Sequence, residues 1–244
     1  MNIIILTEKD FVKVNVYRIS DERALHIRKI LKSEVGDILE IGLLNRSTGT
    51  AKLIGIDDSR IELEVLEFNS TNEDKIKIEI VCALPRPQTL KKVLSTCATM
   101  GVSSLFLIRS EKVEKSYFHS PILKEENYTK FLIEGLSQGK RTRVPKIEIH
   151  HKFKDFFNNG FQETFNNSTC LIAHPDTNKY LSKNIFSANK NLLIAIGPEA
   201  GWNDFEVGLM QEMGFLKFRL SDSILRVENA VTAALAQIEI MKNS

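Results

Sequence analysis

The chain has 244 residues, of which 43% are apolar and 26% are charged, and its formal net charge at pH 7 is +2. This composition is ordinary for a globular protein of one or two domains, and it excludes a low-complexity, collagen-like or coiled-coil chain. Residues 1–72 carry 10 basic and 12 acidic side chains (net −2), and residues 73–244 carry 23 and 19 (net +4). Charge alone therefore does not identify a nucleic-acid binder.

The beginning of the chain does not have the pattern of a secretory leader. One short apolar run, residues 3–6, is followed by acidic groups, whereas a leader needs a basic start and a longer apolar run. The apolar run 192–196 is far shorter than the ~20 residues that cross a bilayer. We therefore expect a cytosolic protein that keeps its N-terminus. Cys82, Cys97 and Cys170 form no Cys-x-x-Cys pair, so they are expected to be reduced thiols that pack as small apolar side chains.

The first third of the chain is predicted to be mostly β-structure. One helix comes first, capped by Asp21 and with apolar residues at near-helical spacing. Apolar and polar residues then alternate along three expected strands, at 34–42, 50–56 and 61–68. Short strands joined by turns indicate a small barrel or sandwich. Residues 69–74 are all polar and predict a linker.

After the linker, strands alternate with helices. The expected strands are residues 75–84, 102–108, 169–173, 191–196 and 215–220. The expected helices are residues 89–100, 120–136, 203–214 and 228–241. Two helix starts are marked by Ser120-Pro121 and by the capping-box spacing of Asn203 and Glu206. The alternation predicts a mostly parallel α/β sheet with helices on both faces, and domains at 1–72 and 73–244.

Three loops of the second domain follow strand ends, at 173–176, 197–201 and 221–226. Ligands of open α/β sheets bind outside the carboxyl ends of the strands, although each loop could also be an ordinary turn. The dinucleotide-binding and P-loop glycine motifs, the zinc-protease motif and the nucleophile elbow are absent from the sequence. The histidines lack metal-ligand spacing, so no metal site is predicted.

Two basic clusters could contact phosphates, and they could equally be solvated faces. One cluster comprises Lys140, Arg141, Arg143 and Lys146, and the other comprises His26, Arg28, Lys29 and Lys32.

The segment 192–236, LLIAIGPEAGWNDFEVGLMQEMGFLKFRLSDSILRVENAVTAALA, resembles the C-terminal signature of the RsmE family. This family comprises 16S ribosomal RNA uridine-N3 methyltransferases of the SPOUT class. Further resemblances follow the family's order: the segments 26–37, 91–102 and 138–145. The chain departs from the family's usual residues at four positions: Ala200, Ser221, Val227 and Asn229.

The resemblance implies a SPOUT-type trefoil-knot methyltransferase domain, preceded by a PUA-like RNA-binding barrel, in a homodimer. It implies S-adenosylmethionine as the cofactor, because the three loops hold it in this family. The cofactor-binding residues that it implies are Ala173, His174, Ile196, Gly197, Gly201, Leu220, Ser221, Ile224 and Leu225. The RNA-binding residues that it implies are Arg28, Lys29, Gln138, Arg141 and Arg143.

The implied reaction is methyl transfer to N3 of a uridine in 16S ribosomal RNA. N3 is a weak acid, so a base or a cation that stabilises its anion would help. Arg226 would position a phosphate or the uracil oxygens, and Glu228 would orient or deprotonate N3. Alternatively, Glu228 only complements the start of the last helix and pairs with Arg226.

Two other functions stay open at the level of the sequence. The departures from the family pattern fit an RNA-binding protein of the same fold that has lost transferase activity. A methyltransferase of the same class acting on a different RNA is the other alternative.

Overall fold

The structure is a computed structural model that describes residues 2–69, 76–157, 160–183 and 190–243. It divides into two compact units, each described here by itself. The first comprises Met1–Glu73 and Ile133–Val144, and the second Asp74–Leu132 and Pro145–Ser244. The first unit thus includes a segment that the sequence analysis assigns to the second domain. Residues 70–74 of the predicted linker lie outside the described residues.

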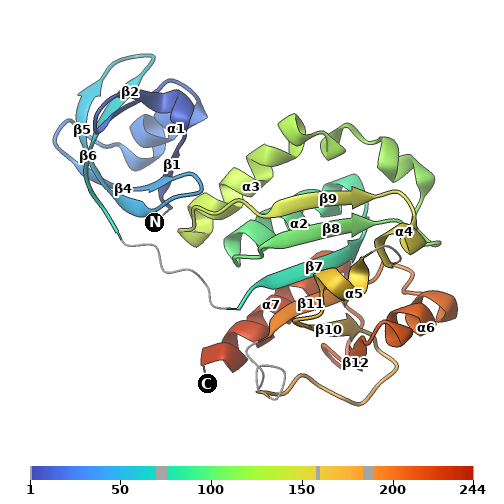
Figure 1. The fold of residues 1–244 in the computed structure, drawn as a ribbon. Coiled ribbons are helices and arrows are strands. Elements are labelled where there is room, and N and C mark those ends of the chain that lie inside the picture. Colours follow the sequence, from blue (N-terminus) through green and yellow to red (C-terminus); the bar gives the residue numbers. More distant parts are fainter. Residues whose placement is uncertain (1, 70–75, 158–159, 184–189, 244) are drawn as a thin grey trace. The chain divides into compact units, whose positions relative to one another are not determined.

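The first unit is a six-stranded sheet in the order β1-β4-β5-β6-β3-β2 (Figure 1). Its strands are β1 Ile4–Leu6, β2 Phe11–Lys13, β3 Val16–Ile19, β4 Ile38–Leu43, β5 Thr48–Ile56 and β6 Ile61–Phe68. Strands β1 and β4 are parallel, and the other pairs are antiparallel. The three strands predicted from alternation are confirmed as β4, β5 and β6, whereas β1, β2 and β3 were not predicted.

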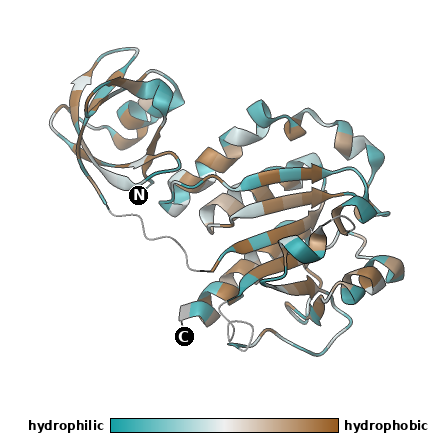
Figure 2. Ribbon diagram, in the orientation of Figure 1, coloured by the Kyte–Doolittle hydropathy of each residue, from teal (hydrophilic) through white to brown (hydrophobic). Residues whose placement is uncertain are grey.

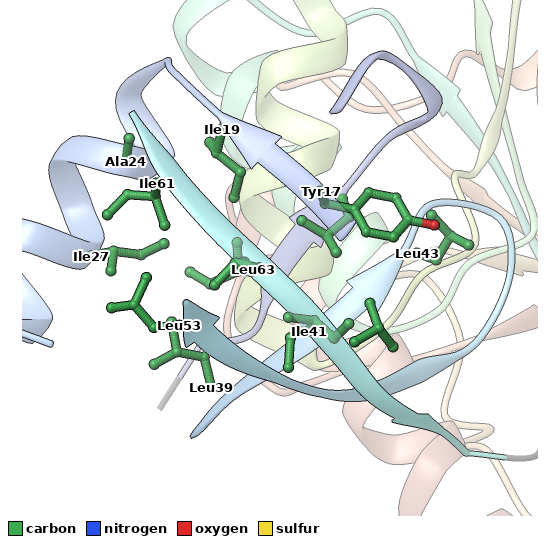
Figure 3. Close-up of a cluster of buried hydrophobic side chains, with 14 residues drawn as sticks. Tyr17, Ile19, Ala24, Ile27, Leu39, Ile41, Leu43, Leu53, Ile61 and Leu63 are labelled. Carbon is green, nitrogen blue, oxygen red and sulfur yellow. The ribbon is translucent and has the colours of Figure 1, made fainter. Parts of the chain in front are cut away.

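Alternation along the strands builds the core of this unit (Figure 3). Leu53, Ile61 and Leu63 are fully buried, while their polar neighbours face outward. Burying each such side chain contributes about 1.5–3 kcal/mol. The predicted helix is confirmed as α1 Glu22–His26, which begins where the Asp21 carboxylate accepts a 3.0 Å hydrogen bond from the Arg23 amide. It continues as a short π-helix, Ile27–Leu31.

The segment Ile133–Val144 completes the first unit by binding the edge of its sheet. The Ile3 amide donates to the Ser137 carbonyl at 3.1 Å, and the Ser137 hydroxyl donates to the Ile3 carbonyl at 2.6 Å. The Asn45 amide donates to the Thr142 carbonyl at 2.7 Å. These bonds pair backbone groups of Ile3, just before β1, and of Asn45, just after β4, that the sheet leaves unpaired.

The second unit is a parallel sheet in the order β12-β10-β11-β7-β8-β9, as predicted, with helices along its faces (Figure 1). Its strands are β7 Ile78–Ala83, β8 Ser104–Ile108, β9 Lys146–His150, β10 Ser168–Ala173, β11 Asn191–Ile196 and β12 Leu216–Phe218. Apart from Asn191 and Glu79 near their starts, the central strands β11 and β7 are hydrophobic, as expected of strands buried on both faces (Figure 2). The trefoil knot implied by the resemblance stays a prediction.

The α-helices of the second half are α2 Pro87–Thr99, α3 Glu125–Gly139, α4 Phe153–Phe157, α5 Phe161–Thr164, α6 Asp204–Glu212 and α7 Val227–Asn243. Shorter 3-10 turns are Glu8–Asp10, Lys115–His119 and Pro121–Leu123. The predicted helix start is confirmed in part, because Ser120 and Pro121 open the 3-10 turn Pro121–Leu123, without a side-chain cap, and not the long helix. Lys124 is extended, with ψ 136°, so the 3-10 turn ends there and α3 begins at Glu125.

The predicted capping box of α6 is confirmed. The Asn203 side chain accepts from the Glu206 amide at 2.8 Å, and the Glu206 carboxylate accepts from the Asn203 amide at 3.0 Å. All three cysteines are buried and free, as predicted. Burial raises the pKa of Cys97 to about 12 and that of Cys170 to about 11. No described helix is long and apolar enough to cross a membrane.

Candidate functional site

A cleft of about 390 Å³, here called the loop cleft, opens at the carboxyl ends of β10, β11 and β12. All three predicted loops contribute to its wall, together with Val227 and Ala230 of α7. The predicted cofactor-binding residues that line it are Ala173, His174, Ile196, Gly197, Gly201, Leu220, Ser221, Ile224 and Leu225, which is the complete predicted set. A space of this size with mostly apolar walls suits a ligand as large as a nucleoside.

The strand pairing explains why these loops meet. Strand β10 pairs in parallel with β11 on one side and with β12 on the other, so the three carboxyl ends share one edge. A 3.0 Å hydrogen bond from the His174 amide to the Phe218 carbonyl joins the first loop to the end of β12. Loops that lie far apart in the sequence are thereby fixed around one cleft.

The second loop has glycine where a side chain would not fit. A Cβ atom at Gly197 would lie 3.1 Å from Nε1 of Trp202, whose ring packs against it. Gly201 has φ +71°, and its amide donates to the Pro198 carbonyl at 2.8 Å to close a turn. Ala200 does not have a positive φ, so alanine stands in place of the family's glycine without backbone strain.

The third loop is held by its own side chains and by α7. The Ser221 hydroxyl accepts from the Ser223 amide at 3.1 Å, so this departure from the family's glycine stabilises the turn. The Gln237 side chain donates to the Leu220 carbonyl at 2.8 Å. Ile224 lines the cleft with 81% of its surface exposed, an apolar area that a ligand would cover.

His174 faces the loop cleft as a neutral imidazole. Burial lowers the pKa of His174 from its ordinary value, and the nearby Lys217 ammonium lowers this pKa further. Its Nδ1 accepts a 3.1 Å hydrogen bond from the Asp176 amide, so the ring proton belongs on Nε2.

Several residues of the loop cleft were missed by the sequence analysis. They are Pro175, Pro198, Glu199, Ala200, Trp202, Arg219, Ser223, Val227 and Ala230. Five of them, Pro175, Pro198, Glu199, Ala200 and Ser223, lie within the predicted loops, so loop membership was the available signal. Two are informative, because Trp202 Nε1 and Arg219 Nε are buried and have no hydrogen-bond partner among the described residues. These donors fit a polar cofactor with an adenosyl group.

Of the two predicted catalytic residues, Arg226 ends the third loop and Glu228 follows in α7, and neither lines the loop cleft. Arg226 is exposed, and the Glu228 side chain is 14% exposed in the first turn of α7. Glu228 Oε1 lies 3.3 Å from Lys92 Nζ, so its hydrogen-bonded ion pair is with α2 rather than with Arg226.

The surroundings of Glu228 keep its carboxylate ionised. Its own backbone N–H lowers the pKa of Glu228 most, and the Lys92 and Arg226 charges lower it further, while burial acts in the opposite direction. A carboxylate with a lowered pKa accepts hydrogen bonds well and is a weak base.

The predicted RNA-binding residues all belong to the first unit. Arg28 is half-buried, and its Nη1 donates to the Asp57 carbonyl at 2.9 Å and to the Asp58 carbonyl. Lys29 is exposed. The other three, Gln138, Arg141 and Arg143, lie at or just after the end of α3. Among the residues the structure describes, no group of three His, Cys, Asp or Glu side chains could hold a metal ion.

Comparison with known proteins agrees with this geometry. The family model described as an RNA methyltransferase domain matches residues 72–239. Ribosomal RNA small subunit methyltransferase E 1 of Borreliella burgdorferi is 29% identical over 234 residues, covering 96% of this chain and 95% of that protein. Ribosomal RNA small subunit methyltransferase E of Treponema pallidum is 29% identical over 242 residues, covering 98% and 90%.

The fold is shared with a solved member of the group. Ribosomal RNA small subunit methyltransferase E of Neisseria gonorrhoeae, crystallised with S-adenosyl methionine, superposes with a TM-score of 0.80 over 98% of both chains at 20% identity. The family model covers most of the chain, and the curated relatives extend the likeness to nearly its whole length. The chain therefore belongs to the RNA methyltransferase family and, within it, to the RsmE group of ribosomal RNA small subunit methyltransferases.

Proposed function

We propose that this chain methylates N3 of a uridine in the 16S ribosomal RNA of the small subunit, in the cytoplasm, with S-adenosylmethionine as methyl donor. The observation that carries the proposal is the meeting of three loops around the loop cleft in a member of this family. The names of the relatives give small-subunit ribosomal RNA as their substrate, and the related structure holds the same cofactor.

The loop cleft offers apolar walls and unpaired donors to the cofactor. Ile196, Leu220 and Leu225 would cover the adenine, and the unpartnered N–H groups of Trp202 and Arg219 would meet its polar atoms. The bound cofactor supplies the methyl group as an electrophile. Neutral His174 would add no positive charge to the wall of the cleft that holds this cationic cofactor.

Glu228 and Arg226 act on the target uridine in this proposal. The ionised Glu228 carboxylate accepts the hydrogen of N3–H, orients the ring, and takes the proton as N3 becomes methylated. The exposed Arg226 guanidinium binds a phosphate or the uracil oxygens. Lys92 keeps the carboxylate in place.

The first unit binds RNA in this proposal through Arg28, Lys29, Gln138, Arg141 and Arg143, as the family's PUA-like barrel does. The chain works as a homodimer. Ala233 and Ala236 of α7 are partly exposed and would permit the close helix approach that such an interface needs, whereas Ala230 and Ala234 are buried within the chain.

Calorimetry with S-adenosylmethionine tests the cofactor site. The intact chain should bind with saturable heat, and Gly197→Val should abolish the heat because its side chain meets the Trp202 ring. Gly208→Ala is the matched control, because a Cβ atom there meets nothing within 4 Å. Absence of heat from the intact chain would favour an RNA-binding protein without transferase activity.

Nucleoside mass spectrometry tests the reaction. Ribosomal RNA from cells lacking the gene should lose N3-methyluridine, and the wild-type gene should restore it. Arg226→Ala and Glu228→Gln should each restore little. Full restoration by both variants would refute their catalytic roles, and a methyl group lost from another RNA would identify a different substrate.

A further inference from the structure

A second cleft, of about 340 Å³, opens where β8 and β9 end, and is here called the edge cleft. Residues 109–111, residues 151–154 and the start of α6 form its wall. The proposed reaction uses none of these residues. Trp202 lines the loop cleft and the next residue, Asn203, lines the edge cleft, so the two clefts are neighbours.

The loops of the two clefts are bound to each other. Lys112 Nζ donates to the Ala200 carbonyl at 3.0 Å, and the Asn203 side chain donates to the Glu111 carboxylate. The Glu111 amide donates to Glu206 Oε1 at 2.8 Å. The edge cleft therefore has a fixed position relative to the loop cleft, as a subsite for one extended ligand requires.

Cations in the edge cleft are available to an anionic ligand. The Arg109 guanidinium forms no hydrogen bond or ion pair with any described residue. Lys152, in contrast, forms an exposed salt bridge with Asp155, with 3.9 Å between Nζ and the carboxylate. Both carboxylates of the wall already accept hydrogen bonds. Glu206, which is 2% exposed, accepts from two backbone amides, and Glu111 accepts from the Asn203 side chain.

The edge cleft also offers an aromatic surface and an unpaired hydroxyl. The Phe205 ring is 55% exposed, and Lys154 Nζ lies 5.0 Å from its centroid. Ser110 lines the cleft and is fully buried, and its Oγ has no hydrogen-bond partner among the described residues. Aromatic rings beside unpaired cations are the features with which proteins bind single-stranded nucleic acid.

We propose that the edge cleft binds a nucleotide of single-stranded RNA adjacent to the methylated uridine. The base stacks on Phe205, Arg109 and Lys154 neutralise the phosphates, and the Ser110 hydroxyl bonds to the nucleotide. This inference rests on the proposed function, because the substrate RNA would occupy both neighbouring clefts.

Binding of a fluorescein-labelled oligouridylate, followed by anisotropy over a range of salt concentrations, tests the proposal. Phe205→Ala should weaken binding about tenfold through the loss of stacking. Leu216→Ala, which removes a side chain that is 63% exposed on β12, should leave affinity unchanged. Arg109→Gln should flatten the dependence of log affinity on log salt by about 0.7, and Lys124→Gln, outside the cleft, should not.

The outcomes separate this proposal from the proposed function. Calorimetric binding of S-adenosylmethionine should be equal in all four variants, because none of these residues lines the loop cleft. If the intact chain neither binds this cofactor nor methylates RNA, the proposed function fails while the oligouridylate result still decides the edge cleft. The proposal is overturned if the intact chain does not bind oligouridylate, or if Phe205→Ala leaves the affinity for oligouridylate unchanged, as Leu216→Ala should.

Discussion

The two units use their charged side chains differently. In the first unit, Arg23 donates to both oxygens of Asp10 at 2.7 Å, and Arg28 Nη1 donates to two backbone carbonyls, so both guanidinium groups contribute to the stability of the fold. In the second unit, the Arg109 guanidinium stands at a cleft without a partner among the described residues. A basic residue in a sequence can therefore either stabilise the fold or stay available to a ligand, and only its neighbours in the structure show which.

The largest expected effect comes from the ion pairs of the first unit. Arg23→Met would leave the Asp10 carboxylate, 8% exposed, without its cation and lower the free energy of unfolding by about 3 kcal/mol. Chemical denaturation measures this loss. Arg18→Met is the control, because the Arg18–Glu62 pair is exposed and contributes under about 1 kcal/mol. Equal losses in the two variants would contradict the distinction between internal and surface pairs.

A smaller effect is expected at the backbone of the loop cleft. Gly201→Ala forces a Cβ atom into a left-handed conformation and should cost about 1 kcal/mol of unfolding free energy, with weaker cofactor binding in calorimetry. Ala200→Gly, one position away, should leave cofactor affinity unchanged, because Ala200 does not have a positive φ. A gain of affinity in Ala200→Gly would show that this departure from the family weakens the site.

Lys29 is an exposed cation next to the half-buried Arg28, so it tests whether exposed basic residues of the first unit bind RNA. Lys29→Gln should flatten the salt dependence of binding to a 16S ribosomal RNA fragment by about one unit. Denaturation should show no change in its stability, since the Lys29 side chain is exposed. An unchanged slope would remove Lys29 from the RNA-binding surface.

The smallest effect concerns pH. The pKa of His174 is below its ordinary value of 6.5, so the unfolded chain takes up a proton there more readily than the folded chain. The stability that neutral His174 contributes is complete above pH 6.5 and is lost as the pH falls below it. His174→Gln should therefore lose less stability than the intact chain between pH 7 and pH 5 in urea denaturation. Identical losses would contradict the direction of the shift.

The sequence predicted most of the elements that carry a strong local pattern. Strand β6 and strand β11 have the predicted bounds, because alternation marks the first and a short apolar run between polar residues marks the second. The capping box at Asn203 located the start of α6 for the same local reason. The signal failed for β2, whose three residues are all exposed, and for α4 and α5, which are too short to show a helical period.

The candidate site was predictable only in part. The loops of the loop cleft could be chosen because they follow strands and resemble a family motif. The Lys92–Glu228 pair and the unpaired Arg109 could not be predicted, because they depend on which helices and loops become neighbours in the fold. The packing of Ile133–Val144 in the first unit likewise depends on tertiary contacts, which leave no local pattern in the sequence.

The first unit is discontinuous in the chain, and this restricts how its parts can be exchanged between relatives. A fragment ending at residue 72 would lack Ser137 and Thr142, and with them the partners of the Ile3 and Asn45 amides. A chimaera that receives residues 1–72 alone would therefore have an unpaired sheet edge. A chimaera that keeps these hydrogen bonds has to take residues 1–72 and 133–144 from the same parent.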